Sequence, residues 1–210
     1  MPTKTNEREY RLINLSLLEI REEQDGRKIV EGYATTFGDE YRLWGDSSFE
    51  LMESVDSRAF DEADMSDVIM QYDHAGRVFA RKSNGTLELG ADEKGLRIKA
   101  DLGGTELGRQ LYEEIQGGYT TKMSFGFTVG KTERREERDE ETGKIIVHRK
   151  ILSFKKIYDV SAVSLPANDA TEISARNIGE GVIAEVEKER LALEARKRKQ
   201  NQIAITAKSF

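Results

Sequence analysis

The chain has 210 residues, of which 37% are hydrophobic and 34% charged, with no cysteine and a formal net charge of −6. The lack of cysteine excludes disulfides, thiolate metal sites and a cysteine nucleophile, and the negative charge argues against general nucleic-acid binding. No apolar run approaches the ~20 residues that span a bilayer, so a soluble protein with no membrane partner is expected.

The first part of the chain predicts strands and a short helix. Residues 1–10 are polar and are predicted to be mobile. Residues 10–23 ("YRLINLSLLEIREE") and 27–38 ("RKIVEGYATTFG") predict a hairpin of two strands that turns at Asp25-Gly26. A short helix is expected over residues 56–67, with Asp56 or Ser57 as its N-cap.

The middle of the chain predicts several short strands over 68–102, followed by an amphipathic helix over 105–118 capped by Thr105. The apolar face of that helix is formed by Leu107, Leu111 and Ile115.

The stretch "KMSFGFTV" (122–129) predicts a strand with two different faces. One face, formed by Met123, Phe125, Phe127 and Val129, can fill a core. The other face places Ser124 beside Gly126 and leaves a strip of bare backbone.

The charged segment 130–150 predicts a solvated loop, or a long hairpin that turns at Thr142-Gly143. Residues 151–168 return to strand alternation, which ends at Pro166, and a helical pattern with a thin apolar stripe runs from about residue 178.

These elements indicate a mainly β, α+β protein with flanking helices, built as a barrel or a sandwich. We expect a mobile N-terminus over 1–10, a β domain over 11–176 and a helical C-terminal appendage over 177–210.

Serine catalysis needs a nucleophile, a base and a group that orients the base. Ser124 is the best-placed nucleophile, although it can also be an ordinary exposed strand serine. The chain has only two histidines, and His74, at the end of a strand, is a better base than His148, which lies between cations. Asp159 is an acid in an apolar strand and needs a partner. That partner is His74, or else Lys155 or Lys156 in a salt bridge.

A metal hydrolase is disfavoured because no HExxH or similar spacing is present. No metal and no cofactor are predicted.

Four stretches together resemble the prohead maturation proteases of tailed bacteriophages, a group related to the herpesvirus assemblins. They span about residues 30–176 and read "EGYATTFG" (31–38), "YDHAGRVFAR" (72–81) with "GTLELGADEKGLRIKADL" (85–102), "KMSFGF" (122–127) and "YDVSAVSLPAN" (158–168).

The resemblance implies a closed β-barrel ringed by helices and a serine endopeptidase packaged inside the immature procapsid in the host cytoplasm. Its polypeptide substrates would be scaffold protein, or the scaffolding segment of the major capsid protein, and finally the protease itself. Homo-oligomerisation is compatible with this assignment.

The residues that the resemblance assigns to the site match the candidates above. The family serine matches Ser124, the family histidine matches His74, and the acid before "VS", most often Glu in the family, is Asp159 here. Gly76 and Arg81 are candidates for stabilising the oxyanion, and the bare strip at Gly126 for holding the peptide.

Two alternatives remain from the sequence. One is a non-catalytic capsid-assembly or scaffolding module that works through its C-terminal helix, and the other is a different hydrolase such as an esterase.

Overall fold

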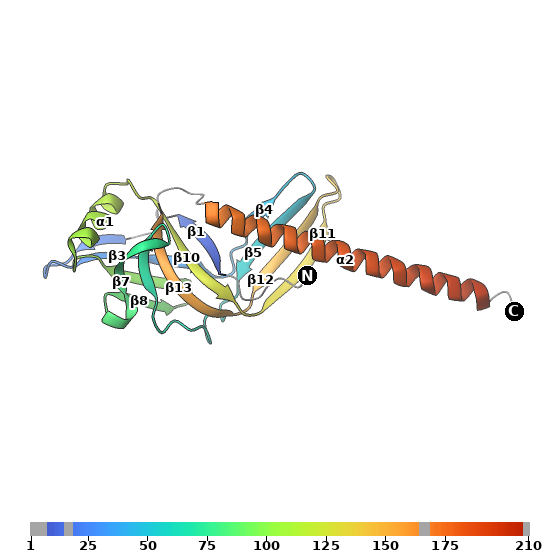
Figure 1. Ribbon diagram of the computed structural model, residues 1–210, viewed down its shortest axis with the longest axis horizontal. Helices are drawn as coiled ribbons and strands as arrows, with labels where there is room; N and C mark the ends of the chain where they lie inside the picture. Colours follow the sequence, from blue (N-terminus) through green and yellow to red (C-terminus); the bar gives the residue numbers. More distant parts are fainter. Residues whose placement is uncertain (1–7, 15–18, 164–168, 208–210) are drawn as a thin grey trace.

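The computed structural model describes residues 8–14, 19–163 and 169–207. The described chain forms three β-sheets of five, four and four strands with two α-helices. Figure 1 shows the sheets gathered in one body, from which the second helix extends far to one side.

The first sheet has the order β1 (Glu9–Asn14), β10 (Lys122–Val129), β13 (Phe154–Val163), β6 (Ile69–Tyr72) and β7 (Ala75–Arg81). The second sheet has the order β11 (Thr132–Arg138), β12 (Ile145–Ile151), β5 (Phe49–Val55) and β4 (Tyr41–Gly45). The third sheet has the order β2 (Glu19–Glu22), β3 (Lys28–Thr36), β9 (Gly95–Asp101) and β8 (Leu87–Ala91). The helices are α1 (Glu106–Gln116), α2 (Asp169–Ala207) and the short 3₁₀ helix η2 (Lys82–Asn84).

The predicted closed barrel is wrong. Across the described residues each of the three sheets ends in edge strands, such as β1 and β7 in the first sheet, and none closes on itself. Period-2 alternation is common to sandwiches and barrels, so the sequence pattern does not report closure. The edge strand β11 reads "TERREER", and such a run of charges discourages pairing with a further strand.

The main core is built mostly from the first and third sheets and α1, with Val55 and Ile151 of the second sheet. Met123, Phe125 and Phe127 of β10 are at most 1% exposed, which confirms the predicted core face of that strand. The Phe127 ring lies 4.7 Å from that of Phe125 and 4.8 Å from that of Phe154, measured between centroids.

The predicted hairpin at Asp25-Gly26 is confirmed, since β2 and β3 pair antiparallel and Gly26 has a φ of 86°. The predicted strand over 10–23 is divided, however, because β1 and β2 belong to different sheets. The predicted end of the last strand at Pro166 lies outside the described residues.

For the charged segment 130–150 the sequence left open a solvated loop or a long hairpin, and the structure shows the hairpin. Strands β11 and β12 pair antiparallel and turn back near Gly143, where φ is 71°. Strand β12 also pairs in parallel with β5, so the segment is part of a sheet.

The predicted amphipathic helix is α1, and the Thr105 hydroxyl accepts a hydrogen bond from the N–H of Gly108 at 3.0 Å. Leu111 and Ile115 are buried, whereas Leu107 is 37% exposed.

The helix predicted over 56–67 is wrong, because this segment forms consecutive turns. The Asp56 carboxylate accepts from the N–H of Arg58 at 3.0 Å, and such local bonds compete with helix formation. Ala59 and Phe60 are nevertheless buried in the main core.

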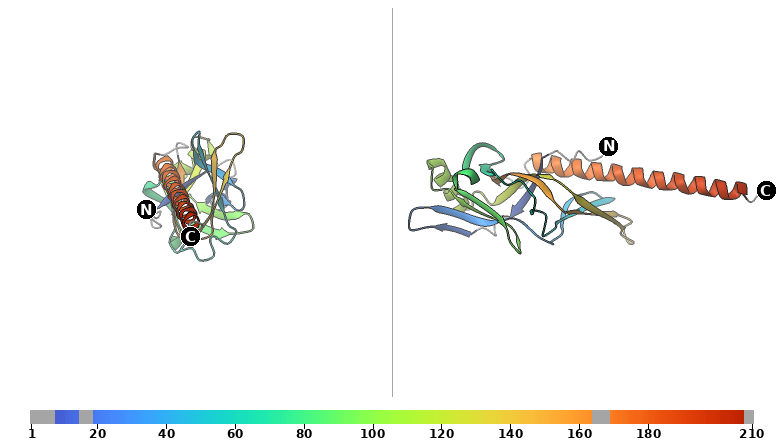
Figure 2. Two further views of the ribbon diagram at one scale, coloured as in Figure 1. Left: turned by 90° about the vertical axis from the view of Figure 1, so that its right-hand side faces the viewer. Right: turned by 90° about the horizontal axis from the view of Figure 1, so that it is seen from below.

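Helix α2 has a packed portion and a projecting portion. Val182 is buried in a second apolar cluster with Phe49 and Leu51 of β5. A Cβ atom at Gly179 would lie 2.5 Å from Trp44 Cε3, so glycine allows the helix to approach this ring closely. Beyond this contact the helix leaves the sheets, as the right-hand view of Figure 2 shows.

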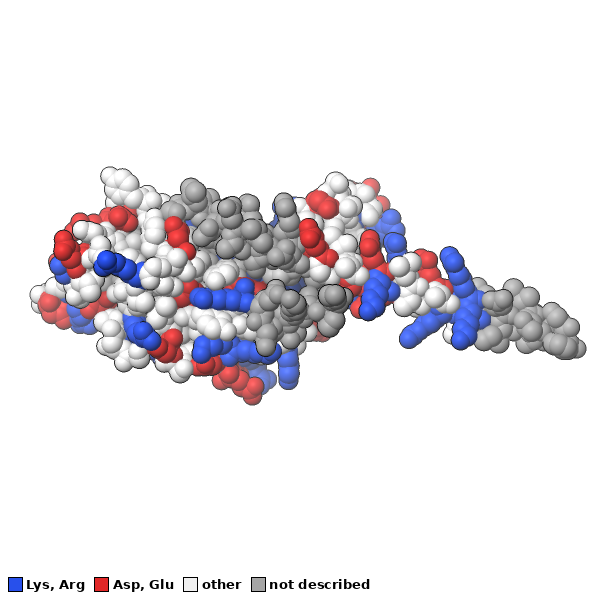
Figure 3. All heavy atoms as spheres, viewed as in Figure 1, with Lys and Arg blue, Asp and Glu red and all other residues white. Residues whose placement is uncertain are grey.

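Figure 3 shows lysine and arginine side chains gathered on the projecting portion of α2, where residues 196–199 read "RKRK" and are exposed. Neither helix of the described chain combines the length and the apolar character that a bilayer crossing requires.

Candidate active site

Strand β10 places Ser124 inside the five-stranded sheet, between β1 and β13. Ser124 pairs with Leu12 of β1 and with Ser161 of β13. The side chain is 0% exposed. Ser124 is therefore not an exposed strand serine, and a substrate can reach it only after the residues that cover it are displaced.

Strand register brings Asp159 to the same face of the sheet as Ser124. Gly126, two residues beyond Ser124, pairs with Tyr10 on one side and Asp159 on the other. Directly paired residues project to the same face. Tyr10, Gly126 and Asp159 thus form one row across the sheet, and the row through Ser124 lies about 7 Å further along the strands.

His74 is presented by a tight turn between β6 and β7. Tyr72 pairs with Ala75, so Asp73 and His74 are the two central residues of a hairpin loop. Their φ angles are 48° and 57°, which is the left-handed region that residues other than glycine rarely adopt. The N–H of Asp73 donates to the carbonyl of Ala162 at 2.9 Å. This bond fixes the turn to β13, and strained backbone of this kind is often found at functional sites.

The turn brings His74 into contact with Asp159, although the two residues are 85 positions apart in the sequence. His74 Nδ1 lies 2.7 Å from Asp159 Oδ2, and the Asp159 side chain is 0% exposed while that of His74 is 7% exposed. Of the alternative partners predicted for Asp159, Lys156 pairs with Asp64 at 2.8 Å.

Other groups complete the surroundings of the buried carboxylate. Arg8 Nη2 lies 2.9 Å from Asp159 Oδ1, and the Ser161 hydroxyl donates to Asp159 Oδ2 at 3.3 Å. A buried carboxylate is costly unless it is paired in this way.

Three polar atoms of the site are buried without a hydrogen-bond partner in the part of the chain that the structure describes. They are Arg8 Nε, Ser124 Oγ and His74 Nε2, so Ser124 Oγ and His74 Nε2 do not bond to each other here. The bond between nucleophile and base is often long in a free enzyme and tightens when substrate binds. With Nδ1 held by a carboxylate, His74 Nε2 is the nitrogen that can accept a proton.

Glycine at position 126 leaves room for the ion pair beside it. A Cβ atom there would lie 2.5 Å from Asp159 Oδ1 and 2.8 Å from Arg8 Nε. The space above Gly126 in this structure is therefore filled by these two side chains. The use of this strip by a peptide stays a prediction.

Three sequence candidates remain, of which Gly76 lies two residues after His74, on β7. Arg81 on β7 forms an ion pair with Asp67, and Gly76 is an exposed residue with a φ of 72°. Their role in binding the oxyanion stays a prediction. His148 on β12 lies 2.7 Å from Glu40 Oε1 through its Nδ1, and this is a different site from that of His74.

The sequence did not indicate Arg8 or Tyr10 as part of the site. The Tyr10 ring lies 4.4 Å from that of His74 between centroids, although residues 1–10 were predicted to be mobile. Burial and the nearby Asp159 carboxylate raise the pKa of Tyr10, against the opposite effect of Arg8. The sequence signal that could have indicated a strand here is the alternation of Arg8 and Tyr10 with Glu9 and Arg11.

Among the described residues, no group of three or more histidine, aspartate or glutamate side chains is arranged to hold a metal ion. The site instead combines a buried hydroxyl, an imidazole and a carboxylate, which are the groups that nucleophilic serine catalysis requires.

Comparison with known proteins finds a family model and solved structures that resemble the chain. A family model described as caudovirus prohead serine protease matches residues 16–184. Among solved structures, the bacteriophage T4 capsid assembly protease gp21 aligns at 13% sequence identity and a TM-score of 0.42, covering 77% of this chain and 100% of that chain. No curated protein matches the chain in sequence.

Proposed function

The chain belongs to the family of caudovirus prohead serine proteases, and from this premise we propose that Ser124 is its nucleophile, His74 its general base and Asp159 the residue that orients His74. The observation that carries the proposal is the 2.7 Å contact between His74 Nδ1 and Asp159 Oδ2. Asp159 lies on the same face of the sheet as Ser124. Membership of a serine protease family favours catalysis over the non-catalytic scaffolding module.

The reaction follows from the roles of these three groups. His74 Nε2 takes the proton of the Ser124 hydroxyl as Oγ attacks the scissile carbonyl carbon. Asp159 keeps the proton of His74 on Nδ1 and stabilises the imidazolium that forms. His74 then protonates the leaving amine, and a water activated by the same imidazole hydrolyses the acyl-enzyme.

The substrate is a polypeptide of the assembling capsid. We propose that the protease acts inside the immature procapsid in the host cytoplasm. It would cleave scaffold protein, or the scaffolding segment of the major capsid protein, and then itself. The burial of Ser124, which is 0% exposed, fits a protease whose site opens only when such a substrate displaces its cover.

The test is to produce the protease together with the scaffold and capsid proteins of the same phage, and to follow the intact masses of all of them over time. The wild-type chain should shorten its partners, whereas Ser124→Ala should leave them at full length. Losing the nucleophile typically lowers the rate on the order of 10⁴- to 10⁶-fold.

A thermal unfolding measurement is the control for this experiment. The Ser124→Ala variant removes one hydroxyl that has no partner among the described residues, so its unfolding temperature should change little. Normal processing of the partners by a folded Ser124→Ala variant would refute the proposal.

A further inference from the structure

Strand β1 contributes two side chains to the surroundings of His74 and Asp159. Arg8, directly before the strand, pairs with Asp159 Oδ1 at 2.9 Å. Tyr10 lies with its ring against His74, with centroids 4.4 Å apart and an interplanar angle of 58°. The Arg8 guanidinium lies over the Tyr10 ring at 5.2 Å and over the Tyr158 ring at 4.7 Å. These contacts connect β1 to both members of the pair.

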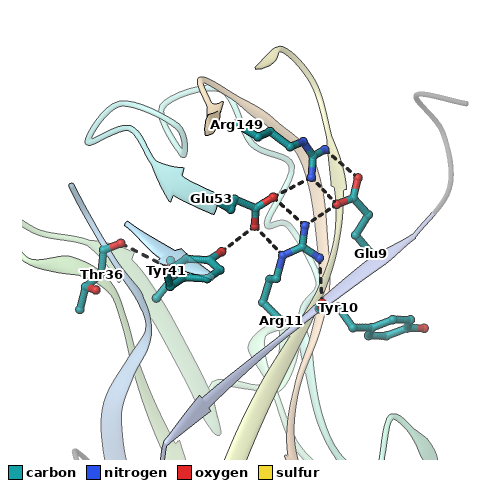
Figure 4. A network of polar contacts seen from close by, with 8 residues as sticks. Glu9, Tyr10, Arg11, Thr36, Tyr41, Glu53 and Arg149 are labelled. Atoms are coloured by element: carbon teal, nitrogen blue, oxygen red, sulfur yellow. Dashed lines mark hydrogen bonds and ion pairs between the residues drawn. The ribbon is translucent and has the colours of Figure 1, made fainter. Parts of the chain in front are cut away.

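The opposite face of β1 belongs to a buried ionic network, shown in Figure 4. Arg11 Nη2 donates to Glu53 Oε2 at 2.8 Å and to Glu9 Oε2 at 2.7 Å. Arg149 donates to Glu53 Oε2 at 2.6 Å. In Figure 4 the Tyr10 side chain points away from this network.

The network fixes the strand in one register. Glu53 is 0% and Arg11 4% exposed, and breaking such a buried pair by removing one partner is strongly destabilising. A slip of one residue would exchange the two faces of β1. It would carry Tyr10 into the network and Arg11 toward Asp159, so the ion pairs hold Arg8 and Tyr10 on the side of the site.

We propose that Arg8 and Tyr10 are positioning residues for the catalytic pair, held in place by the ionic network behind them. This inference rests on the roles proposed above for Ser124, His74 and Asp159. Arg8 binds Asp159 Oδ1 at 2.9 Å, whereas His74 Nδ1 lies nearer to Oδ2, at 2.7 Å, than to Oδ1, at 3.2 Å. Arg8 therefore holds the carboxylate with Oδ2 toward the imidazole. Tyr10 supports one side of the imidazole, whose backbone is held in a left-handed turn.

The experiment compares four variants of the full chain with the wild type, using a peptide that spans a cleavage site mapped in the capsid or scaffold protein. For Arg8→Gln we expect kcat to fall roughly tenfold to hundredfold, as for a misplaced catalytic group, with little change in KM. Arg8→Lys keeps a cation that can bind Asp159 and should restore most of the wild-type kcat.

Tyr10 is tested by activity and by the ring protons of His74, which NMR can follow because the chain has only two histidines. Tyr10→Leu should lower kcat and shift the His74 ring-proton resonances, since the ring current of the tyrosine is lost. The His148 resonances should stay in place. Tyr10→Phe keeps the ring and should behave as the wild type.

Matched controls are Arg27→Gln, at an exposed ion pair with Asp25, and Tyr119→Leu, at a ring that is 83% exposed. Both should keep the kinetics of the wild type. Wild-type kcat in Arg8→Gln, or an unchanged His74 signal in Tyr10→Leu, would overturn this inference.

Unfolding of either variant at the assay temperature would assign a structural role and would also overturn the inference. These failures leave the proposed function standing as long as Ser124→Ala is inactive. An active Ser124→Ala variant would remove the premise itself.

Discussion

At the scale of single residues, the site depends on how closely charged side chains approach the backbone of β10. A Cβ atom at position 126 would lie 2.5 Å from Asp159 Oδ1 and 2.8 Å from Arg8 Nε. Both are atoms at the ends of side chains, which can move aside at modest cost. A change at Gly126 should therefore affect the geometry of Asp159 more than the folding of the sheet.

Gly126→Ala is expected to lower kcat roughly tenfold to hundredfold, because the displaced carboxylate no longer holds His74 in place. Its unfolding temperature should stay within a few degrees of the wild-type value. Kinetics and thermal unfolding of the same preparation check this prediction. A fully active Gly126→Ala variant would show that the position of Asp159 does not limit the rate.

His74 and His148 are expected to respond differently to substitution. His74→Ala should match Ser124→Ala in severity, and the double variant should be little worse than either, because nucleophile and base act as a unit. His148 binds Glu40 Oε1 at 2.7 Å through its Nδ1 on β12, so His148→Ala should keep activity within about twofold. Loss of activity in His148→Ala alone would reassign the base.

The candidate site was predictable from sequence only in part. Ser124, His74 and Asp159 were found because motifs and local alternation identify residues of unusual type. The contributions of Arg8 and Tyr10 were not, because pairing between β1 and β10 joins segments more than 100 residues apart. Polar composition near a terminus predicts mobility, and it cannot indicate that a buried ionic partner such as Glu53 is present elsewhere in the chain.

At the scale of elements, α2 divides into a portion that covers the second sheet and a portion that projects from it. Val182 is buried, and Ile178, Ile183 and Val186 pack against the same cluster. Arg134 of β11 binds Glu185 at 3.1 Å and Glu189 at 2.8 Å. The two portions should contribute unequally to stability.

Two truncations test this division and the boundary predicted at residue 176. A chain ending at Arg190 keeps the packed portion and should unfold at nearly the wild-type temperature. A chain ending at Arg176 uncovers Trp44 and Phe49 and should lose about 3 kcal/mol of apolar burial, or roughly 6–12 °C. Both chains should fold and cleave peptide. Failure of the shorter chain to fold would make the predicted boundary wrong.

The elements that were predicted correctly have local signals. The hairpins at Gly26 and Gly143 have glycines at positive φ, and α1 has a capping threonine with an apolar face. The helix expected over 56–67 failed because its aspartates bond to nearby backbone N–H groups. Aspartate and serine are favoured both at helix caps and in turns. Their presence over 56–67 therefore does not distinguish a capped helix from a series of turns.

At the scale of the whole molecule, the buried carboxylate of Glu53 connects the first and second sheets and makes stability depend on pH. Burial alone would raise the pKa of Glu53, but ion pairs with Arg11 and Arg149 outweigh it and lower the pKa from 4.5 to about 2. The folded-state pKa lies below the unfolded value. The contribution is therefore present above the unfolded pKa of 4.5 and is lost as pH falls through about 2.

Urea unfolding between pH 6 and pH 2 measures this contribution. At about 1.4 kcal/mol per pKa unit, the wild type should lose about 3 kcal/mol from Glu53 over this range. Glu53→Gln should be less stable at pH 6, since Arg11 and Arg149 lose their charged partner, and its stability should depend less steeply on pH. Equal acid dependence in the two proteins would contradict the role assigned to Glu53.

Closure of the sheets was the feature of the fold that the sequence could not predict. Alternation along β10 or β13 indicates that the two faces of the strand have different surroundings. It does not indicate whether the strand lies at the edge or in the interior of its sheet. The charged strand β11 ends the second sheet, and β1, which ends the first, is joined to β5 of the second sheet by an ion pair. These are relations between distant segments.

The central claim is that Ser124 is the nucleophile activated by His74, and covalent labelling tests it most directly. An active preparation is treated with diisopropyl fluorophosphate, and the modified residue is located by mass spectrometry of its peptides. We expect one adduct on Ser124 that forms in step with the loss of activity, and much slower labelling in His74→Ala. An adduct on another serine that accounts for the inactivation, or full activity after Ser124 is completely labelled, would contradict the claim.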